Sequence, residues 1–469
     1  MSGFSSLNTA VTGLNAAQRA LDTISQNISN SQTEGYSRQR VKLSSIGAPV
    51  TATLWTGGGS QLGGVRVDTV ERIRDAFLEG ARSAAGARMS ALTAQTGALQ
   101  GAERLMAEPS DNGLQSVLDD FYSAWHDLAK NVTNEAGASA GSVVIKSGEA
   151  VADQLKFVYQ GLAAQWTTSH ADLDSVVTQT NMYSKELAAV NEQVRAGLAG
   201  DRPINELLDR RDTLARTLGE LVGGTSMLSD DGTATISVNG VTIVSGARAE
   251  TLQLVGADDV STAAGNPPAL MWGTTTVPVA SGTAAGLLSV LASDLPSTVA
   301  AVDKVAVALR DAVNLVHGQG FRLDGVAGAD FFTGTGAADL AVAVTDASEL
   351  AVSKQVGAVD GSNAAAIGDL IDDRVSYAAL GSPGASQQWR TLTAGLGVKV
   401  QNAERSIEVQ RSVVATADDA VASDAGVNVD EEMTNMLLVQ RSYQAASRVI
   451  TTVDEMLDTL INRTGTVGR

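Results

Sequence analysis

Three histidines, His126, His170 and His317, are the side chains best suited to acid–base or metal chemistry in this chain. None has a second histidine or a set of carboxylates at metal-ligand spacing, and no HExxH motif is present. His170 and Asp172 would form a dyad only if they faced each other, yet residues two apart on a helix point in different directions. The histidine positions therefore predict neither a zinc site nor a general base.

The glycine-rich stretch WTGGGSQLGGVRV (55–67) is the next candidate for chemistry. It lacks the GK[ST] of a phosphate-binding loop, so we expect a turn between two strands. Acidic pairs at 119–120, 230–231, 258–259 and 372–373 lack the spaced D-x-D-x-D-G pattern of a calcium loop. No G-x-S-x-G motif is present either. The sequence thus predicts no enzyme, no cofactor and no bound metal.

Two long amphipathic patterns lie at opposite ends of the chain. Their apolar residues step alternately by three and four, and polar residues such as Gln18 and Gln440 interrupt both seams. This spacing predicts two helices that pair as a coiled coil, with the polar seam residues fixing the register. The expected assembly-interface positions on these helices are Leu7, Val11, Leu14, Leu21, Ile24, Ile28, Met436, Gln440, Tyr443, Ile450, Leu457 and Ile461.

The polar stretch TEGYSRQR breaks the first amphipathic pattern. Gly35 can adopt a positive φ, which favours a helix end and a bend there. A tyrosine such as Tyr36 usually packs with its hydroxyl at the rim of an interface. Arg38 and Arg40 either form a solvated face or reach carboxylates of a neighbouring subunit, since arginine suits fixed ion pairs.

The middle of the chain carries more helix of the same kind. Apolar residues at steps of three and four run from Val151 to Val194, which predicts a helix of about 45 residues, roughly 65–70 Å long. Similar stripes cover residues 70–105 and 389–421. Helices this long with narrow apolar stripes are typical of elongated bundles.

Between these helical patterns lie segments that read as short strands and turns. Residues 230–246 read as two strands around Asn239-Gly240, the dipeptide preferred in type I′ hairpin turns. Short strands are also expected at 251–256, 270–280 and 340–353. The predicted fold is mainly α with an inserted β-rich domain. Its expected parts are a terminal assembly domain (1–60 and 427–469), a helical rod domain (61–221, 294–321 and 367–426) and a β-rich outer domain (222–293 and 322–366).

Charge and composition exclude several classes of partner. The net charge of −19 lies entirely within residues 111–426, which argues against nucleic acid. The chain has no cysteine, so no disulfide framework is expected. Its start has no basic region and no contiguous apolar run, and no run of about 18 apolar residues occurs elsewhere. We therefore expect neither a secretory signal peptide nor membrane insertion.

Residues 2–41, SGFSSLNTAVTGLNAAQRALDTISQNISNSQTEGYSRQRV, resemble the N-terminus shared by bacterial flagellar rod, hook and hook-associated proteins. The shared features are a small-residue amphipathic helix, an N-I-x-N end and an x-x-G-Y turn. The continuation GYSRQRV and the C-terminal GVNVDEEMTNMLLVQRSYQAASRVITTVDEMLDTLINRTG are similar to the hook-associated branch. Interior segments resemble the same branch in the same order, at 121–137, 207–225, 230–246 and 313–332.

The resemblance implies a secreted structural protein of the flagellum. Both termini would pair at the inner wall of a tube, with the rod outside them and the β-rich domain projecting further. Implied partners are copies of itself in a ring, the hook protein, a second hook–filament junction protein and a cytosolic export chaperone at the C-terminal region. Export would use the flagellar type III channel and end outside the cell at the hook–filament junction. In that setting Gly35 bends the chain out of the inner wall, Tyr36 packs into the next subunit, and Arg38 and Arg40 bridge subunits.

Other interpretations stay open at this point. A hook or distal-rod protein would share the ends, although its sequence after the aromatic typically differs from SRQRV. An enzyme on a flagellar scaffold would need a site within 222–366, where no catalytic constellation appears. A secreted adhesin or type III effector would account for the rod and the β-rich domain but not for the paired terminal patterns.

Overall fold

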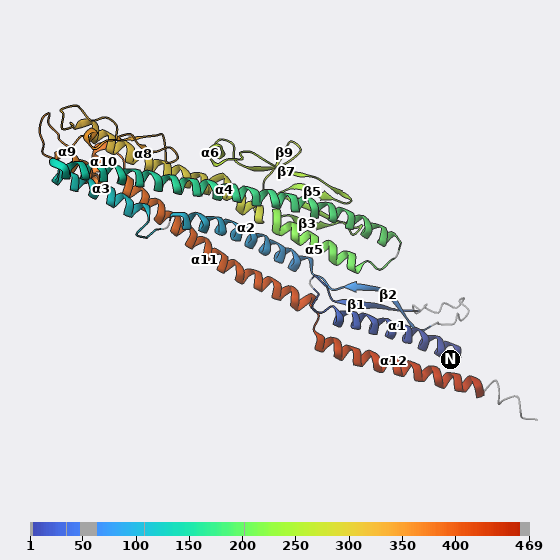
Figure 1. Ribbon diagram of the computed structural model, residues 1–469. Helices are drawn as coiled ribbons and strands as arrows, with labels where there is room; N and C mark the ends of the chain where they lie inside the picture. The colour runs from blue at the N-terminus through green and yellow to red at the C-terminus, as the bar shows by residue number, and fades with distance from the viewer. Residues whose placement is uncertain (1–2, 34, 47–62, 107, 201, 460–469) are drawn as a thin grey trace, which may run out of the picture.

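The computed structural model describes residues 3–33, 35–46, 63–106, 108–200, 202–459. Figure 1 shows an elongated molecule. A bundle of long helices forms its body, small sheets lie on one flank of that body, and the first and last helices lie together at one end. The fold is mainly α with small β elements, which confirms the predicted fold class.

The long helices are α1 (Gly3–Ser29), α2 (Ala76–Met106), α3 (Leu114–Lys130), α4 (Asn134–Ala199), α5 (Asn205–Val222), α8 (Leu295–Gln319), α11 (Ala385–Ala425) and α12 (Val429–Asp458). The shorter helical segments are α6 (Val260–Ala263), α7 (Thr283–Ser289), the π-helical η1 (Val290–Asp294), the 3-10 turns η2 (Ala347–Glu349) and η3 (Asp369–Ile371), α9 (Ser362–Gly368) and α10 (Asp373–Leu380).

Helix α4 is the central helix of the bundle and packs against α3, α5, α8 and α2. It has 66 residues and spans roughly 100 Å at about 1.5 Å per residue. The predicted helix is therefore present and extends beyond both expected ends. Its buried side chains repeat at the predicted steps of three and four, as at Val151, Leu155, Val158, Leu162, Trp166, Leu173, Val176, Leu187, Val190 and Val194.

The π-helical turn η1 is held by polar contacts from neighbouring helices. Trp166 is fully buried, and its indole N–H donates to the carbonyl oxygen of Leu291 at 3.0 Å. Asp294, itself buried, pairs with Lys399 of α11 and accepts a hydrogen bond from Gln95 Nε2 at 2.9 Å. These contacts tie α4, α2 and α11 to the start of α8.

Among the described residues, one helical run, Thr283–Gln319, is long and apolar enough to cross a membrane by length and composition alone. Half of its most apolar window is buried within the protein. The run comprises α7, η1 and α8, which pack against α2, α4 and α11. These contacts are those of a core helix in a bundle.

The small sheets occupy one flank of the body (Figure 1). One sheet has the order β3-β4-β5-β6 and the next β7-β8-β9, with all neighbours antiparallel. Asn239 and Gly240 have φ of 45° and 87°, which confirms the predicted turn with two positive φ angles. The strands are β3 (Thr225–Leu228), β4 (Ala234–Val238), β5 (Val241–Ser245), β6 (Arg248–Ala249), β7 (Leu252–Val255), β8 (Ala269–Trp272) and β9 (Thr275–Val277).

Two local predictions were wrong. Residues 340–353 were expected to be a strand, but the strand there is only β11 (Ala341–Val342), and it pairs with β10 (Phe332–Thr333) rather than with β3–β9. The Asp346 and Glu349 side chains form a capping box there, which favours the helical turn η2. Val70 was placed on a helical stripe but lies in β2 (Val65–Arg72), which pairs with β1 (Gln39–Ser45).

Candidate assembly interface

The paired helices α1 and α12, together with strands β1 and β2, form what we call the terminal unit. Helix α1 packs against α12 on one side and against the β1–β2 hairpin on the other. The two helices run antiparallel, so the N-terminal end of α1 lies near the C-terminal end of α12 (Figure 1). The predicted pairing of the terminal helices is therefore present within one chain.

The interface positions predicted on α1 have mixed environments. Ile24 is buried, and Val11 is 38% exposed. The remaining residues of this set are half-buried, namely Leu7, Leu14, Leu21 and Ile28. The stripe that is most buried lies beside the predicted one and contains Ala10, Ala16, Ala17, Thr23, Ile24 and Asn27. Contact with the hairpin as well as with α12 accounts for this rotation of the buried face.

The positions predicted on α12 are less covered. Only Glu432 and Val453 are buried among the described residues of this helix. Met436, Tyr443, Ile450 and Leu457 are half-buried, whereas Ile461 lies outside the described residues. Gln440 is exposed, and so is Gln18 on α1. Neither glutamine is therefore placed to fix the register of the pair, which corrects that expectation.

A bend after α1 was predicted, and the chain there returns to the helix, since Tyr36 and Gln39 both bond to Asn27. Gly35 has φ +80°, and a Cβ atom there would lie 2.6 Å from Thr213 Oγ1 of α5. Tyr36 donates its hydroxyl proton to Asn27 Oδ1 at 2.8 Å. Burial raises the pKa of Tyr36 to about 12, with further contributions from Asp209, Glu432 and Glu206. Glycine is needed at position 35 because a side chain would meet both strain and a neighbour.

Asn27 is the centre of a polar cluster that the sequence analysis did not single out. Its side chain is 1% exposed. Nδ2 donates to the Gln39 carbonyl oxygen at 2.8 Å and to Glu432 Oε2 at 3.0 Å. Oδ1 accepts from Gln39 N at 3.0 Å and from the Tyr36 hydroxyl. The N-I-x-N end of the first helix was the available signal, but an asparagine beside a helix end is more often just a cap or a turn residue.

The two arginines of the turn have carboxylate partners inside the chain. Arg38 Nε donates to Glu432 Oε1 at 2.8 Å, and its NH1 lies 3.3 Å from Glu431 Oε2. Arg40 Nε donates to Glu71 of the paired strand at 2.8 Å. Arg38 therefore joins the first and last segments of one subunit, and Arg40 ties the hairpin together.

A second charged cluster connects the terminal unit to the rod. Arg72 at the end of β2 is 6% exposed and lies 2.7 Å from Asp209 and 2.5 Å from Asp212 of α5. Asn205 Nδ2 donates to Gln39 Oε1 and to the Val70 carbonyl oxygen. Burial raises the pKa of Asp209, while Arg72 lowers it. Arg72 and Asn205 therefore join strands β1 and β2 of the terminal unit to α5 of the rod through ion pairs and hydrogen bonds.

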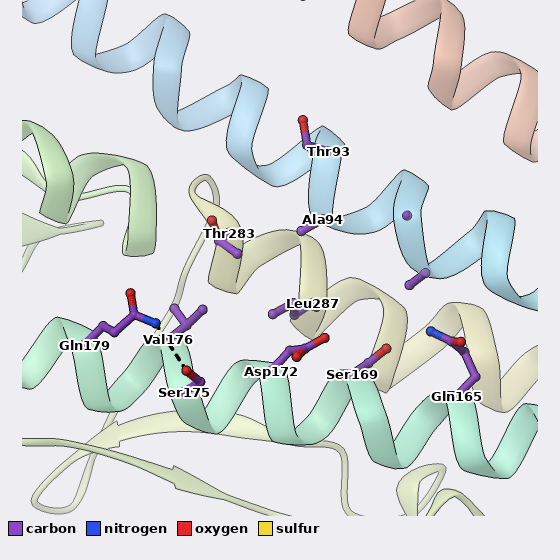
Figure 2. A pocket seen from close by; sticks show the side chains of 12 residues that line it. Thr93, Ala94, Gln165, Ser169, Asp172, Ser175, Val176, Gln179, Thr283 and Leu287 are labelled. Atoms are coloured by element: carbon purple, nitrogen blue, oxygen red, sulfur yellow. Dashed lines mark hydrogen bonds between the residues drawn. The ribbon is translucent and has the colours of Figure 1, made fainter.

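The residues considered above for catalysis or metal binding do not form a site together. His170 stacks on Trp166 with ring centroids 5.2 Å apart. Asp172 instead lines a groove of about 440 Å³ between α2, α4 and α7, and it is the ionisable residue among the described residues that line this groove (Figure 2). The remaining groove residues are amides, hydroxyls and small apolar side chains such as Gln165, Ser169 and Ala94. Among the residues that the structure describes, no group of three or more histidine, aspartate or glutamate side chains could hold a metal ion.

Family models match three parts of the chain. The model of the flagella basal body rod protein matches residues 7–36, and that of the flagellar basal body rod FlgEFG protein C-terminal region matches 421–463. The model of the flagellar hook-associated protein FlgK helical domain matches 99–332. The ends are thus of a type shared with rod proteins, and the rod helices are of the hook-associated type.

Relatives that align with the whole chain show which family it belongs to. The flagellar hook-associated protein 1 of Bacillus subtilis is 30% identical, and the alignment covers 100% of this chain and 100% of that protein. The chain belongs to the flagellar hook-associated protein 1 family. Members from Salmonella typhimurium and Escherichia coli are 27% and 26% identical, covering 97% of this chain and 99% of theirs. This family membership favours a hook-associated protein over the hook and distal-rod alternatives.

The family also accounts for the fold. The flagellar hook junction protein FlgK from Burkholderia pseudomallei superposes with a TM-score of 0.64 at 14% identity, covering 73% of this chain and 99% of that one. Members of the hook-associated protein 1 family are structural components of the bacterial flagellum that assemble with other flagellar components. The sequence resemblance to flagellar axial proteins is therefore confirmed.

Proposed function

We propose that this member of the hook-associated protein 1 family joins the flagellar hook to the filament as a ring of subunits that assemble axially through their terminal helices. The names of the relatives support a junction role, since the solved relative is a hook junction protein. The exposed apolar surface of α12 supports assembly through the termini. Its side chains include Met433 (50% exposed), Leu437 (57%), Leu438 (55%), Val449 (45%) and Met456 (59%).

That surface carries the proposal because large apolar side chains gain stability only when something covers them. Burying a fully exposed leucine or methionine side chain contributes about 1.5–3 kcal/mol. These side chains are about half exposed, so each would gain roughly half of that amount. Helix α1 covers one side of α12, and the opposite side is left for neighbouring subunits. Burial of these side chains against copies of the same helix would stabilise a tubular inner wall.

The remaining parts of the chain are assigned from their place in the fold. The terminal assembly domain (1–60 and 427–469) would line the central channel, and the helical rod domain (61–221, 294–321 and 367–426) would surround it. The β-rich segments 222–293 and 322–366 would face outward, which agrees with the net charge carried by residues 111–426.

The partners follow from the same arrangement. They are copies of the chain itself, the hook protein below and a second junction protein above. The apolar α12 also suits a cytosolic export chaperone, which would cover the C-terminal region before secretion through the type III channel. The assembled protein would then lie outside the cell at the hook–filament junction.

Cosedimentation with isolated hooks tests the assembly role. The full-length protein should pellet saturably with hooks, whereas a chain that ends at Asp424 should stay in the supernatant. A full-length L437D/L438D variant should also fail to pellet, since two buried charges would replace apolar contacts.

A matched surface variant separates assembly from general charge effects. V409D/V413D adds the same charges to exposed positions of α11, where the valines are 63% and 47% exposed. This variant should pellet as the wild type does. Equal pelleting of all four proteins, or of none, would contradict the assignment of the termini as the docking element.

A further inference from the structure

The α1–α12 pair contains one buried polar cluster within an otherwise small and aliphatic interface. Asn27 and Glu432 are 1% and 2% exposed, and they come from opposite ends of the sequence. The neighbouring buried residues of α1 are largely alanines, such as Ala10, Ala16 and Ala17. Small side chains of this kind fit many registers almost equally well, so they select none of them.

The hydrogen bonds of the cluster are complete in one register only. Asn27 uses both N–H groups and accepts two hydrogen bonds at Oδ1. Glu432 Oε1 accepts from Arg38 Nε at 2.8 Å and lies 2.7 Å from its NH2, while Oε2 accepts from Asn27. A fully satisfied buried network of this type is disrupted as a whole when one member moves.

A slip of α12 by one helical turn would break the bonds that Glu432 makes with Asn27 and Arg38, whereas the Asn27 bonds to Gln39 and Tyr36 lie within the N-terminal segment and would persist. The shift is about 5.4 Å, which is far beyond hydrogen-bonding distance. It would bring Met436 or Asn428 to the place of Glu432. Neither offers a carboxylate to Arg38, and Glu432 would be left without its donors. The slipped pair would therefore hold unpaired polar groups that the native pair does not have.

We propose that Asn27, Arg38 and Glu432 are the register-determining residues of the terminal helices, selecting the in-register pairing of α1 with α12 over slipped pairings. The inference deepens the proposed function, because it concerns how the assembly element obtains one defined geometry. The role resembles that of a buried polar residue in a coiled coil, which fixes register at some cost in stability. The exposed Gln18 and Gln440 become suitable positions for probes instead.

Because the chain has no cysteine, nitroxide labels attach only to cysteines that are introduced for the test. Nitroxide labels on Q18C and Q440C in the full-length protein report the α1–α12 distance by pulsed electron paramagnetic resonance, for the free protein and for the fraction pelleted with hooks. The wild-type cluster should give one narrow distance. An N27L/E432M variant should give a second distance or a shift of about 5 Å, the rise of roughly one turn. Arg38 keeps Glu431 as a partner in that variant, at 3.3 Å.

One further variant separates the register from the effect of the new side chains. S25L/Q444M places the same two side chains at exposed positions and should keep the single narrow distance. A single unshifted distance in N27L/E432M, or a broad distance in hook-bound wild type, overturns the proposal. Failure of the wild type to pellet with hooks would instead count against the junction role, while the distance in the free protein still reports the register.

Discussion

Ala351 donates its backbone N–H to Nε2 of His317 across 3.0 Å in the end of the rod. Because that nitrogen accepts, Nδ1 must carry the ring proton and donate it to the Ala329 carbonyl oxygen at 2.5 Å. The imidazole is fully buried, with the rings of Trp125 and Phe331 each 6.0 Å away. A neutral His317 thus attaches two loop segments to α8, and a second ring proton would face the Ala351 N–H.

This geometry predicts that stability falls in mild acid. Burial lowers the pKa of His317, and Arg322 lowers it further, against raising contributions from the Ala329 hydrogen bond and Asp330. The unfolded chain takes up a proton near pH 6.5, about its ordinary value, which the folded chain resists. The free energy of unfolding should therefore decrease as the pH falls below about 6.5 and be unaffected by this group above it.

Urea unfolding near neutral pH and at about one unit below the ordinary histidine pKa measures this effect. The matched variant is His317→Gln, which keeps a donor and an acceptor but does not titrate. It should lose about 1–3 kcal/mol near neutral pH, because its geometry is imperfect. The difference between wild type and variant should shrink in acid. A constant difference would show that His317 does not carry the pH dependence.

The joint between the terminal unit and the rod gives a second prediction. Replacing Arg72 with Met leaves Asp209 without this cation, whereas Asp212 keeps Arg211 at 2.7 Å and Arg74 at 3.6 Å. The loss of unfolding free energy should therefore not exceed the cost of an uncompensated buried charge, about 3–5 kcal/mol. Because burial raises the pKa of Asp209, the loss should be smaller in acid, where a protonated Asp209 needs no counter-charge. Adding D209N to R72M should restore part of the loss.

The control for this experiment lies on the same strand. Arg66 pairs with Asp68 at 2.9 Å, but its side chain is 71% exposed. Water competes for such a pair, so R66M should cost only about 0–1 kcal/mol. Equal losses in R72M and R66M would mean that charge pairing at the joint contributes no more than surface pairing elsewhere.

The sequence predicted much of the framework because local signals and tertiary structure agree there. The stripe from Val151 to Val194 becomes the buried face of α4, since one apolar face of a long helix must find a core. Asn239 and Gly240 form the expected turn because few other residues tolerate two positive φ angles.

The register of the terminal helices could not be predicted from local sequence patterns. Heptad spacing pointed to Gln18 and Gln440, yet both are exposed. The β1–β2 hairpin also packs on α1 and rotates the buried face of that helix away from Gln18. The residues that do meet, Asn27 and Glu432, are 405 positions apart. No local pattern shows that an asparagine near a helix end and a glutamate in the first turn of another helix will share a hydrogen bond.

The bend at Gly35 gives the last prediction, and Gly13 supplies its control. Gly35→Ala should lose about 1–3 kcal/mol, because an L-residue is strained at φ +80° and the new Cβ would lie 2.6 Å from Thr213 Oγ1. Gly13 lies within α1, and a Cβ atom added there would have no neighbour within 4 Å beyond the backbone of its own helix. Gly13→Ala should therefore gain about 0.5–1 kcal/mol through helix propensity.

Thermal unfolding and hook cosedimentation of both variants separate strain from contact. Removing the Thr213 hydroxyl and methyl in G35A/T213A should recover only the contact part of the loss, since the backbone strain persists. G35A should also weaken pelleting with hooks, because Tyr36 and Gln39 would no longer meet Asn27 from the turn. If G35A matches G13A in both measurements, the turn does not position the cluster, and the bend at residue 35 is only a connection between α1 and β1.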